Sequence, residues 1–295
     1  MKLTVVIPTY NRPGIVVDTV RRLQALDPPP DAIIVVDQTP TTNEELRTTN
    51  AQVIRLDAPS IPHAMNVGLL AAATPLVLFL DDDVEPSPQL VAGHRDAHAD
   101  EAIWAVVGQI LQPGEEPAHV EQPRDDLEFR FFAADGRFVT NVMAGNLSVK
   151  RERAVEAGGF DENYVQAAYR FETDFALRLA GAGGKIWFEP RASLRHLKLA
   201  TGGLRSFGDH RVTASPAHAA GDYYFALGHR RFFWPYAARR LMKNVATRYL
   251  LAHPWFIPSK IVGEVRGMLL ARRLWRAGPK LVGSSWSTVD RGGAE

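Results

Sequence analysis

The sequence predicts an open α/β sheet, mostly parallel and flanked by helices, followed by a helical C-terminal extension. Short apolar runs alternate with helical patterns through the first hundred residues, and the apolar runs are continuous rather than alternating. Strands of a parallel sheet covered on both faces have this pattern, whereas a strand with one wet face alternates apolar and polar residues. From about residue 204 onward the strand patterns stop and helical patterns take over.

Each element of the sheet follows from its own pattern. The strands expected in the first hundred residues are short apolar or β-branched runs, over residues 3–7, 32–37, 52–56 and 76–80. A helix should follow the first strand, with Asn11 as its cap and Pro13 in its first turn. A second helix is expected over residues 66–73. The elements expected after residue 87 are strands over 103–111, 139–149 and 185–188, and helices over 88–98, from 152, and over 173–180.

Composition excludes several classes of protein. With 295 residues, 46% of them hydrophobic, the chain can bury a full core. Cysteine is absent, which excludes disulfides, thiolate zinc sites and cysteine nucleophiles. A proline at position 8 and the lack of a cleavable small-residue site argue against a signal peptide. Because no run of about 18 apolar residues exists, no membrane span is expected, and the expected location is the cytoplasm.

The segment from residue 229 to residue 280 is strongly basic. It holds twelve Lys and Arg residues against one acid, Glu264, although the net charge of the chain is +1. The cations interleave with apolar residues at helical spacing. The aromatic residues near the expected helix ends are Phe232, Phe233, Trp234, Trp255 and Phe256. These features predict peripheral contact with an anionic membrane. The alternative is a solvated basic face on helices that pack against the preceding domain. Nucleic acid is not an expected partner, because no recognisable binding module accompanies the charge.

Three carboxylates, Asp81, Asp82 and Asp83, directly follow the most apolar strand of the chain. In open α/β sheets, ligands bind outside the carboxyl ends of the strands. Adjacent carboxylates repel one another unless a cation is present. In an extended chain Asp81 and Asp83 point to one side and Asp82 to the other. Two carboxylates on one side suit a hard cation such as Mg²⁺ or Mn²⁺, which could neutralise a diphosphate. The alternative is that the three acids only favour the start of the next helix.

Seven short motifs resemble, in the same order, those of family 2 glycosyltransferases over about residues 1–200. They are Val5–Arg12, Val35–Asp37, Ala64–Asn66, Phe79–Asp83, Gly145–Val149, Gly158–Glu162 and Glu172–Arg178. The resemblance implies a GT-A-like (Rossmann-like) sheet. The domain would have a nucleotide-sugar-binding half over 1–110 and an acceptor-binding half over 111–203. The basic, aromatic helical extension over 204–295 would follow it. The resemblance also implies an enzyme of polysaccharide biosynthesis type, an inverting glycosyltransferase. Such an enzyme moves a sugar from a nucleotide-diphosphate sugar to an acceptor hydroxyl. The basic segment over 229–280 adds the expectation of a peripheral location on the inner face of the cell membrane, with a saccharide or lipid-linked acceptor.

The resemblance also implies roles for individual residues. The residues expected to bind the donor are Pro8, Thr9, Tyr10, Arg12, Asp37, Asn66, Asp81 and Asp82. Asp81, Asp83 and His196 would hold Mn²⁺ or Mg²⁺. Glu172 falls where the family carries its general base, which takes the proton of the acceptor hydroxyl. The residues expected to contact the sugar or the acceptor are Gly145, Asn146 and Asp174.

Each role has a structural alternative. Glu172 and Asp174 could be acids that favour the start of a helix. Gly145 and Asn146 could form an ordinary turn before a strand, and His196 could be a hydrogen-bonded structural histidine. The sequence also departs from the family at Met65, which stands where arginine is usual, at Phe171–Glu172 in place of Glu-Asp, and at Asp37–Pro40 in place of the usual polar turn.

Two other functions remain open at this point. One is a nucleotidyltransferase on a similar sheet, against which the lack of a Gly-rich phosphate loop after the first strand argues. The other is a non-catalytic nucleotide-sugar-binding or membrane-scaffold protein. The presence of Asp81, Asp83 and Glu172 argues against it.

Overall fold

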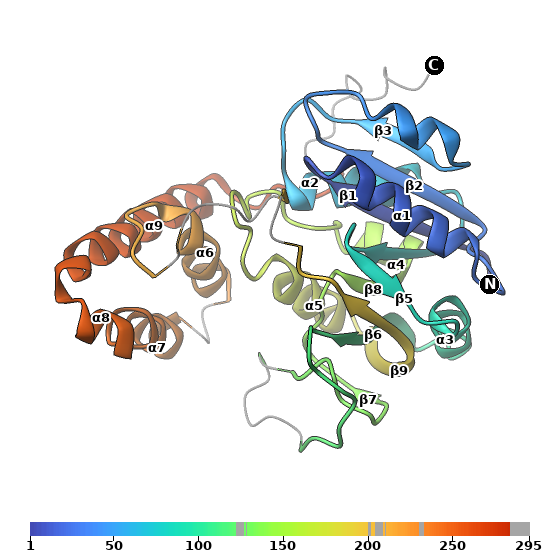
Figure 1. The fold of residues 1–295 in the computed structure, drawn as a ribbon. Helices are drawn as coiled ribbons and strands as arrows, with labels where there is room; N and C mark the ends of the chain where they lie inside the picture. Colours follow the sequence, from blue (N-terminus) through green and yellow to red (C-terminus); the bar gives the residue numbers. More distant parts are fainter. Residues whose placement is uncertain are drawn as a thin grey trace. The chain divides into compact units, whose positions relative to one another are not determined.

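The chain divides into two compact units. A computed structural model describes residues 1–121, 127, 129–199, 202–203, 209, 211–229 and 233–283 (Figure 1). The first unit comprises Met1–Phe160 and Phe175–Gly203, and the second comprises Asp161–Asp174 and Leu204–Glu295. Phe232 and residues 204–208 of the expected extension lie outside the described residues.

The first unit is built on one mixed sheet, whose strand order in the described residues is β3-β2-β1-β4-β8-β6-β9-β5, with β7 paired to β9 (Figure 1). The strands are β1 (Leu3–Thr9), β2 (Ala32–Asp37), β3 (Gln52–Arg55), β4 (Leu76–Leu80), β5 (Val84–Pro86), β6 (Ile103–Leu111), β7 (Arg137–Phe138), β8 (Asn146–Lys150) and β9 (Lys185–His196). Strands β1 to β4 pair in parallel, whereas β8 runs antiparallel to both β4 and β6. The predicted α/β sheet is confirmed: it is parallel in its first half and mixed beyond it.

Helices flank this sheet. They are α1 (Pro13–Gln24), α2 (Ile61–Ala71), α3 (Leu90–Ala97), α4 (Arg151–Glu156) and α5 (Phe171–Gly181), with a 3-10 turn, η1 (Glu44–Thr48). The boundary between the two units falls inside α5. Every residue of β4 is buried, as its uninterrupted apolar run predicts. Helix α1 packs Val16, Val20 and Leu23 into the same core.

Two local expectations are wrong. Asn11 does not cap α1. Its φ is 54°, and the cap position is occupied by Arg12, whose side chain does not bond to the backbone N–H groups at the start of the helix. The left-handed backbone of Asn11 lets its N–H bond to the Thr39 hydroxyl at 2.9 Å instead. Helix α2 begins at Ile61, five residues earlier than expected, because Ser60 caps it and Pro62 suits its first turn.

Strand β9 is longer than its apolar run suggests, and its far end pairs with β5. The expected strand ended at residue 188, but the ladder continues to His196 past Pro190. Antiparallel pairing sets Val84 opposite His196 and Pro86 opposite Leu194. The chain after the three aspartates is therefore a short strand first, and α3 starts only at Leu90.

The second unit is helical, as the sequence predicts for the extension. Its elements are η2 (Pro216–His218), α6 (Ala220–Gly228), α7 (Phe233–Val245), α8 (Arg248–Ala252), η4 (Pro254–Phe256) and α9 (Ile257–Ala277). Residues 161–163 are tied into this unit. The Tyr224 hydroxyl donates to Asp161 at 2.7 Å, and Lys280 pairs with Glu162 at 2.7 Å. None of the described helices is both long and apolar enough to cross a membrane.

A buried chain of hydrogen bonds joins α3 to β8. The Asn146 amide nitrogen donates to two backbone carbonyls, so its oxygen faces His94 Nε2 at 2.8 Å and must accept from it. Ser148 Oγ then donates to His94 Nδ1 at 2.8 Å and accepts from His98 Nε2 at 2.9 Å. This pattern uses both imidazoles in the neutral form. Burial lowers the pKa of His94 to about 4 and that of His98 to about 3.

The neutral histidines predict a loss of stability in acid. Both pKa values lie below the ordinary 6.5, so the full contribution is present above pH 6.5 and falls as the pH drops toward the folded-state values. His98→Gln removes one of these groups. The difference in unfolding free energy between pH 7 and pH 5 should therefore shrink by about 2 kcal/mol, measured by urea denaturation. An unchanged difference in the folded His98→Gln variant would contradict the account.

Candidate active site

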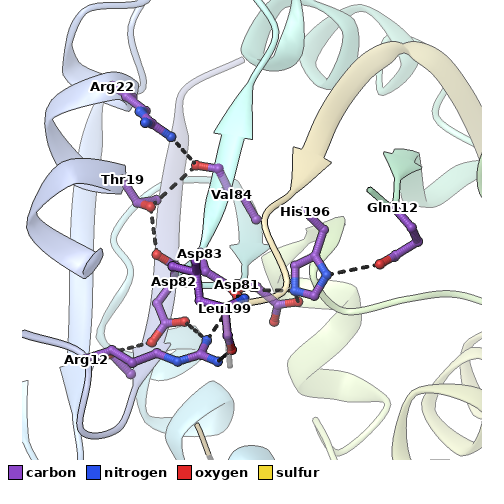
Figure 2. Close-up of polar contacts among 11 residues, drawn as sticks. Arg12, Thr19, Arg22, Asp81, Asp82, Asp83, Val84, Gln112, His196 and Leu199 are labelled. Atoms are coloured by element: carbon purple, nitrogen blue, oxygen red, sulfur yellow. Dashed lines mark hydrogen bonds and ion pairs between the residues drawn. The ribbon is translucent and has the colours of Figure 1, made fainter. Parts of the chain in front are cut away.

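The three aspartates at the end of β4 differ sharply in exposure. The side chain of Asp81 is 54% exposed, whereas those of Asp82 and Asp83 are 7% and 2% exposed. A buried carboxylate needs partners, since burial without them costs far more than a single hydrogen bond returns. The surroundings of Asp82 and Asp83 supply such partners from β1, the start of α1 and the end of β9 (Figure 2).

The β5–β9 ladder brings the end of β9 to these aspartates. Beyond the Val84–His196 pair, the N–H of Leu197 donates to the Asp83 carbonyl at 2.9 Å, and the N–H of Leu199 donates to Asp83 Oδ2 at 3.2 Å. Asp83 and His196, which are 113 positions apart in the sequence, are thereby neighbours. The sequence-based assignment of Asp83 and His196 to one site depended on family resemblance, and the ladder provides its physical basis.

His196 faces both outer aspartates. Its Nε2 atom lies 3.1 Å from Asp83 Oδ1 and 3.7 Å from Asp81 Oδ2, and its Nδ1 atom lies 3.1 Å from Gln112 Oε1 (Figure 2). Nδ1 donates to that amide oxygen, which leaves Nε2 as the atom directed at the carboxylates. The contact with Asp83 raises the pKa of His196 against the opposing effect of burial. Burial acts to raise the pKa of Asp83, but the contact with His196 and the charge of Arg12 outweigh it and lower that pKa.

The donor set fits a divalent cation. Asp83 Oδ1 is buried and accepts no hydrogen bond of acceptable geometry, so a lone pair is available there. Two ligands bound at right angles to one cation at about 2.1 Å lie about 3 Å apart, close to the 3.1 Å between Asp83 Oδ1 and His196 Nε2. Among the described residues, no group of three or more His, Asp or Glu side chains converges as a complete metal centre. A cation here would need further oxygen ligands, such as those of a diphosphate or water.

Arg12 neutralises the buried side of the cluster. Its Nη1 atom lies 2.7 Å from Asp82 and 3.2 Å from Asp83, and its Nη2 donates to the Leu199 carbonyl at 3.1 Å. The Thr9 hydroxyl donates to Asp82 at 2.6 Å. Burial still raises the pKa of Asp82 to about 6, in spite of these partners. Thr9 and Arg12 therefore lie at the site, where they hold Asp82 and the 197–199 segment.

A glycine permits the close approach of β8 to the aspartates. A Cβ atom on Gly145 would lie 2.4 Å from Asp81 Oδ2, inside any normal contact distance. The backbone of residue 145 thus forms a wall beside Asp81 that a larger residue would push outward. The close approach depends on the lack of a side chain at residue 145.

The family of the chain is decided by a sequence match. The family model for glycosyl transferase family 2 matches residues 4–152, just over half of the 295 residues. The chain belongs to glycosyl transferase family 2. The family and enzyme class expected from the motifs are confirmed. Among curated proteins, none matches the sequence significantly.

Solved structures of glycosyltransferases share the fold of this glycosyltransferase. GalNAc-T7 with UDP, GalNAc and Mn²⁺ matches with a TM-score of 0.57 and 16% identity, over 80% of this chain and 52% of that one. The chain thus spans about half of the length of GalNAc-T7. The mannosyltransferase PcManGT from Pyrobaculum calidifontis, with GDP-Man and Mn²⁺, matches at 0.55 and 19% identity over 94% and 79% of the two chains. S. aureus TarS 1–349 with UDP-GlcNAc matches at 0.57 and 15% identity over 94% and 92%.

Two asparagines of the expected binding set are core residues of this glycosyltransferase. Asn146 is fully buried, and its amide donates to the carbonyls of Gln109 and Ala192 at 3.0 and 2.8 Å, so its side chain holds β8 to its neighbours rather than facing a sugar. Asn66 is equally buried and forms both a donor and an acceptor bond with the backbone of Phe160, each at 2.8 Å. The expectation of direct ligand contact by these two side chains is corrected to a positioning role.

Asp37 at the end of β2 is also inside the protein. It is 1% exposed; one of its oxygens accepts from the Thr39 N–H at 2.9 Å and the other pairs with Arg55 at 3.3 Å. Arg55 also donates to the carbonyls of residues 39 to 41, and so fixes the loop after β2. The sequence analysis missed Arg55. Its place as the last residue of β3, beside the carboxyl end of β2, was the available signal.

The remaining expected residues belong to different units: Pro8 and Tyr10 to the first, and Glu172 and Asp174 to the second. Pro8 and Tyr10 are partly exposed at the end of β1, and the Tyr10 carbonyl accepts from the N–H of Gly203 at 3.0 Å. Glu172 and Asp174 lie in the first turn of α5 and belong to the second unit. Asp174 is buried and lies 2.9 Å from His229 Nε2, which favours a positioning role for it.

The wall formed by Gly145 leads to a mutational prediction. Gly145→Ala should displace the Asp81 carboxylate, because the new methyl group cannot coexist with Oδ2 at 2.4 Å. Cation-dependent nucleotide binding should weaken roughly tenfold, whereas stability should change little, because the half-exposed Asp81 side chain can rotate away from the new methyl group. Gly181→Ala, where a Cβ meets nothing within 4 Å, is the matched control for both measurements. Unaltered nucleotide binding by a folded Gly145→Ala variant would show that Asp81 does not contact the ligand.

Proposed function

We propose that this family 2 enzyme transfers a sugar, with inversion at the anomeric carbon, from a nucleotide-diphosphate sugar to an acceptor hydroxyl. A divalent cation, Mn²⁺ or Mg²⁺, assists the transfer. The observation that carries the proposal is the meeting of Asp83, Asp81 and His196 at the carboxyl end of β4. Parallel α/β sheets bind ligands at this edge, and the acidic side chains there cannot hold a diphosphate without a cation.

The residues that would hold the cation are Asp83, His196 and the more exposed Asp81. When bound, the cation supplies Lewis-acid stabilisation of the negative charge on the departing diphosphate. Asp83 is suited to this role because its pKa is lowered, so it is ionised at neutral pH, and because its buried Oδ1 atom faces His196 Nε2, the other proposed ligand, at 3.1 Å. The Mn²⁺ in the complexes of GalNAc-T7 and PcManGT, which share the fold, supports the same class of cofactor here.

Arg12 and Thr9 support the donor side. They neutralise and orient Asp82 from the loop after β1, so that Asp81 and Asp83 are left to face the ligand. The nucleotide is proposed to lie beside Pro8 and Tyr10 at the end of β1, with the loop that Asp37 and Arg55 hold together forming the opposite side. The nucleotide sugars bound by GalNAc-T7, PcManGT and TarS differ, so the base and the sugar of this donor are left to experiment.

Glu172 is proposed as the general base. Inversion requires a base on the face of the sugar opposite the diphosphate, within hydrogen-bond reach of the acceptor hydroxyl. In this step, the acceptor oxygen bonds to the anomeric carbon, and the acceptor hydroxyl passes its proton to Glu172. The bond from the anomeric carbon to the diphosphate oxygen breaks, and the nucleoside diphosphate leaves. Asp174 lies in the same first turn of α5 as Glu172 and is held by His229. It would thereby fix the start of the helix that carries Glu172.

The acceptor is proposed to be a saccharide or a lipid-linked saccharide. The basic character of residues 229–280 supports a peripheral location on an anionic membrane, at the inner face of the cell membrane, where a lipid-linked acceptor would be met.

Calorimetric titration with UDP, GDP, dTDP and CDP, each with and without Mn²⁺, tests the donor site. One diphosphate should bind tightly and only with the cation. Asp83→Asn should weaken that binding by roughly 100-fold, about 3 kcal/mol, because a neutral amide replaces a cation ligand. The control Asp18→Asn, at an exposed acid on α1, should bind as the unaltered protein does. If the folded protein binds none of the four with Mn²⁺, the donor assignment is wrong and the scaffold alternative is favoured.

The role of Glu172 is tested separately from binding. Glu172→Gln should lower the rate of transfer roughly 10²- to 10⁴-fold, the range of general-base catalysis, and leave diphosphate binding unchanged. Glu152→Gln is the matched control, since Glu152 is an acid in the first turn of another helix, α4. If Glu172 only favours the start of α5, both variants should transfer at the normal rate and lose at most about 1 kcal/mol of stability.

A further inference from the structure

Helix α9 turns its small and charged residues inward. Its buried residues recur every three or four positions and are Lys260, Gly263, Glu264, Gly267 and Ala271. A Cβ on Gly267 would lie 2.4 Å from the side chain of Ala219, so the glycine allows very close packing against the start of α6. Glu264, 2% exposed, accepts from the Tyr223 hydroxyl at 2.9 Å and from Arg240 at 3.0 Å. The inward face is therefore complete without the large apolar residues of the helix.

Those apolar residues lie on the outward face. Ile261, Val262, Val265, Met268 and Leu269 share one side of α9 by helical spacing and are 42% to 62% exposed. A helix of a soluble domain normally has the opposite arrangement, with its apolar stripe in the core. An apolar stripe of this kind, contiguous over two turns, marks a surface that meets something other than water.

The neighbouring elements of the second unit also expose large apolar residues. Helix α7 exposes Trp234, Leu241 and Met242, and the segment between α7 and α9 exposes Leu251 and Trp255. Of the fifteen large hydrophobic residues that are exposed in the described part of the chain, eleven lie between positions 234 and 275. Helix α9 carries most of these eleven residues, and its outward stripe is named here the apolar face.

Only cations accompany the apolar face. Within the described residues 233–283 the exposed charged side chains are Arg239, Lys243, Arg248, Arg266, Arg272, Arg273, Arg276 and Lys280. The acid in that range, Glu264, is buried. By their spacing, Arg266 and Arg273 flank the stripe of α9 on one side. A surface of this composition is complementary to a partner that is apolar inside and anionic at its boundary.

We propose that the apolar face is a membrane-docking surface, which lies in the headgroup region of an anionic bilayer with its apolar side chains inserted. A second copy docked through the same face fits poorly, because it would bring like charges together and the described residues 233–283 offer no exposed acid to pair with them. A nucleic acid would use the cations but not an aliphatic stripe. The inference rests on the proposed function in one respect, that a lipid-linked acceptor gives the docking its purpose.

The docking surface and the proposed base belong to the same compact unit. Lys280, which follows α9, pairs with Glu162, and its N–H donates to Asp161 at 2.9 Å. Residues 161–174, which end at the first turn of α5, are therefore held to the C-terminal end of α9 by these noncovalent contacts. A membrane-bound second unit would present Glu172 to acceptors carried in the same bilayer.

Co-sedimentation of the full chain with vesicles tests the proposal. The vesicles consist of phosphatidylcholine with or without phosphatidylglycerol, at low and high salt, without nucleotide. The protein should bind the anionic vesicles and be released by salt. The double variant Val265→Ser, Met268→Ser should reduce the partition coefficient roughly tenfold, and Arg266→Gln, Arg273→Gln about 30-fold. Val53→Ser, at an exposed apolar residue of β3, is the matched control and should bind normally.

Several results would overturn the proposal. One is failure of the unaltered, folded protein to bind anionic vesicles at low salt; another is full binding by the Val265, Met268 variant, which would reduce the effect to charge alone. If the protein does not bind vesicles but forms concentration-dependent dimers that the Val265, Met268 variant abolishes, the face is a contact between two copies of the chain.

Circular dichroism and diphosphate titration are the controls for fold and donor site, and both should be unchanged in these variants. If the unaltered protein bound none of the diphosphates, the proposed function would be refuted, but vesicle binding would still support the docking surface.

Discussion

The pairing of three-residue strand β5 with the end of β9 is the constraint on which the candidate site depends. It sets His196 opposite Val84, so that the imidazole faces the aspartates that immediately precede β5. It also carries the chain onward, so that the N–H groups of residues 197 and 199 bond to Asp83. Three acids on a loop could adopt many arrangements. Because β5 is anchored in the sheet, Asp83 is held in one position and its Oδ1 atom remains available to a ligand.

Charge compensation explains why such a cluster can be stable without a ligand. Two of the three carboxylates are buried, and each would be costly to ionise alone. Arg12 lies between Asp82 and Asp83, and the contact with Asp83 raises the pKa of His196. These contacts compensate part of the negative charge of the cluster when no cation is present. The second unit compensates charge differently. Its one described acid beyond residue 233, Glu264, is buried against Arg240 and Lys260, and the other described cations beyond that residue are exposed.

The sequence predicted features that follow from local patterns. The apolar runs predicted β1 to β4 and β6 to within two residues, and helical spacing predicted that the chain after residue 204 is helical. It failed where distant partners decide the outcome. Asn146 reads as a surface turn residue, yet it is buried because carbonyls of β6 and β9 accept its amide hydrogens. Likewise β9 extends past Pro190 because β5 pairs with it, and no local pattern records that pairing. Asp81, Asp83 and His196 were expected at one site, and the structure brings them together; their roles remain proposals.

The central claim is that Asp83 and His196 are ligands of one divalent cation that also binds the donor diphosphate. Anomalous diffraction at the manganese edge, from crystals grown with Mn²⁺ and the diphosphate that binds, tests it most directly. The account predicts one peak within bonding distance of Asp83 Oδ1, His196 Nε2 and a phosphate oxygen. A well-ordered diphosphate with no peak at Asp83, and with His196 Nε2 still in contact with that carboxylate, would contradict it.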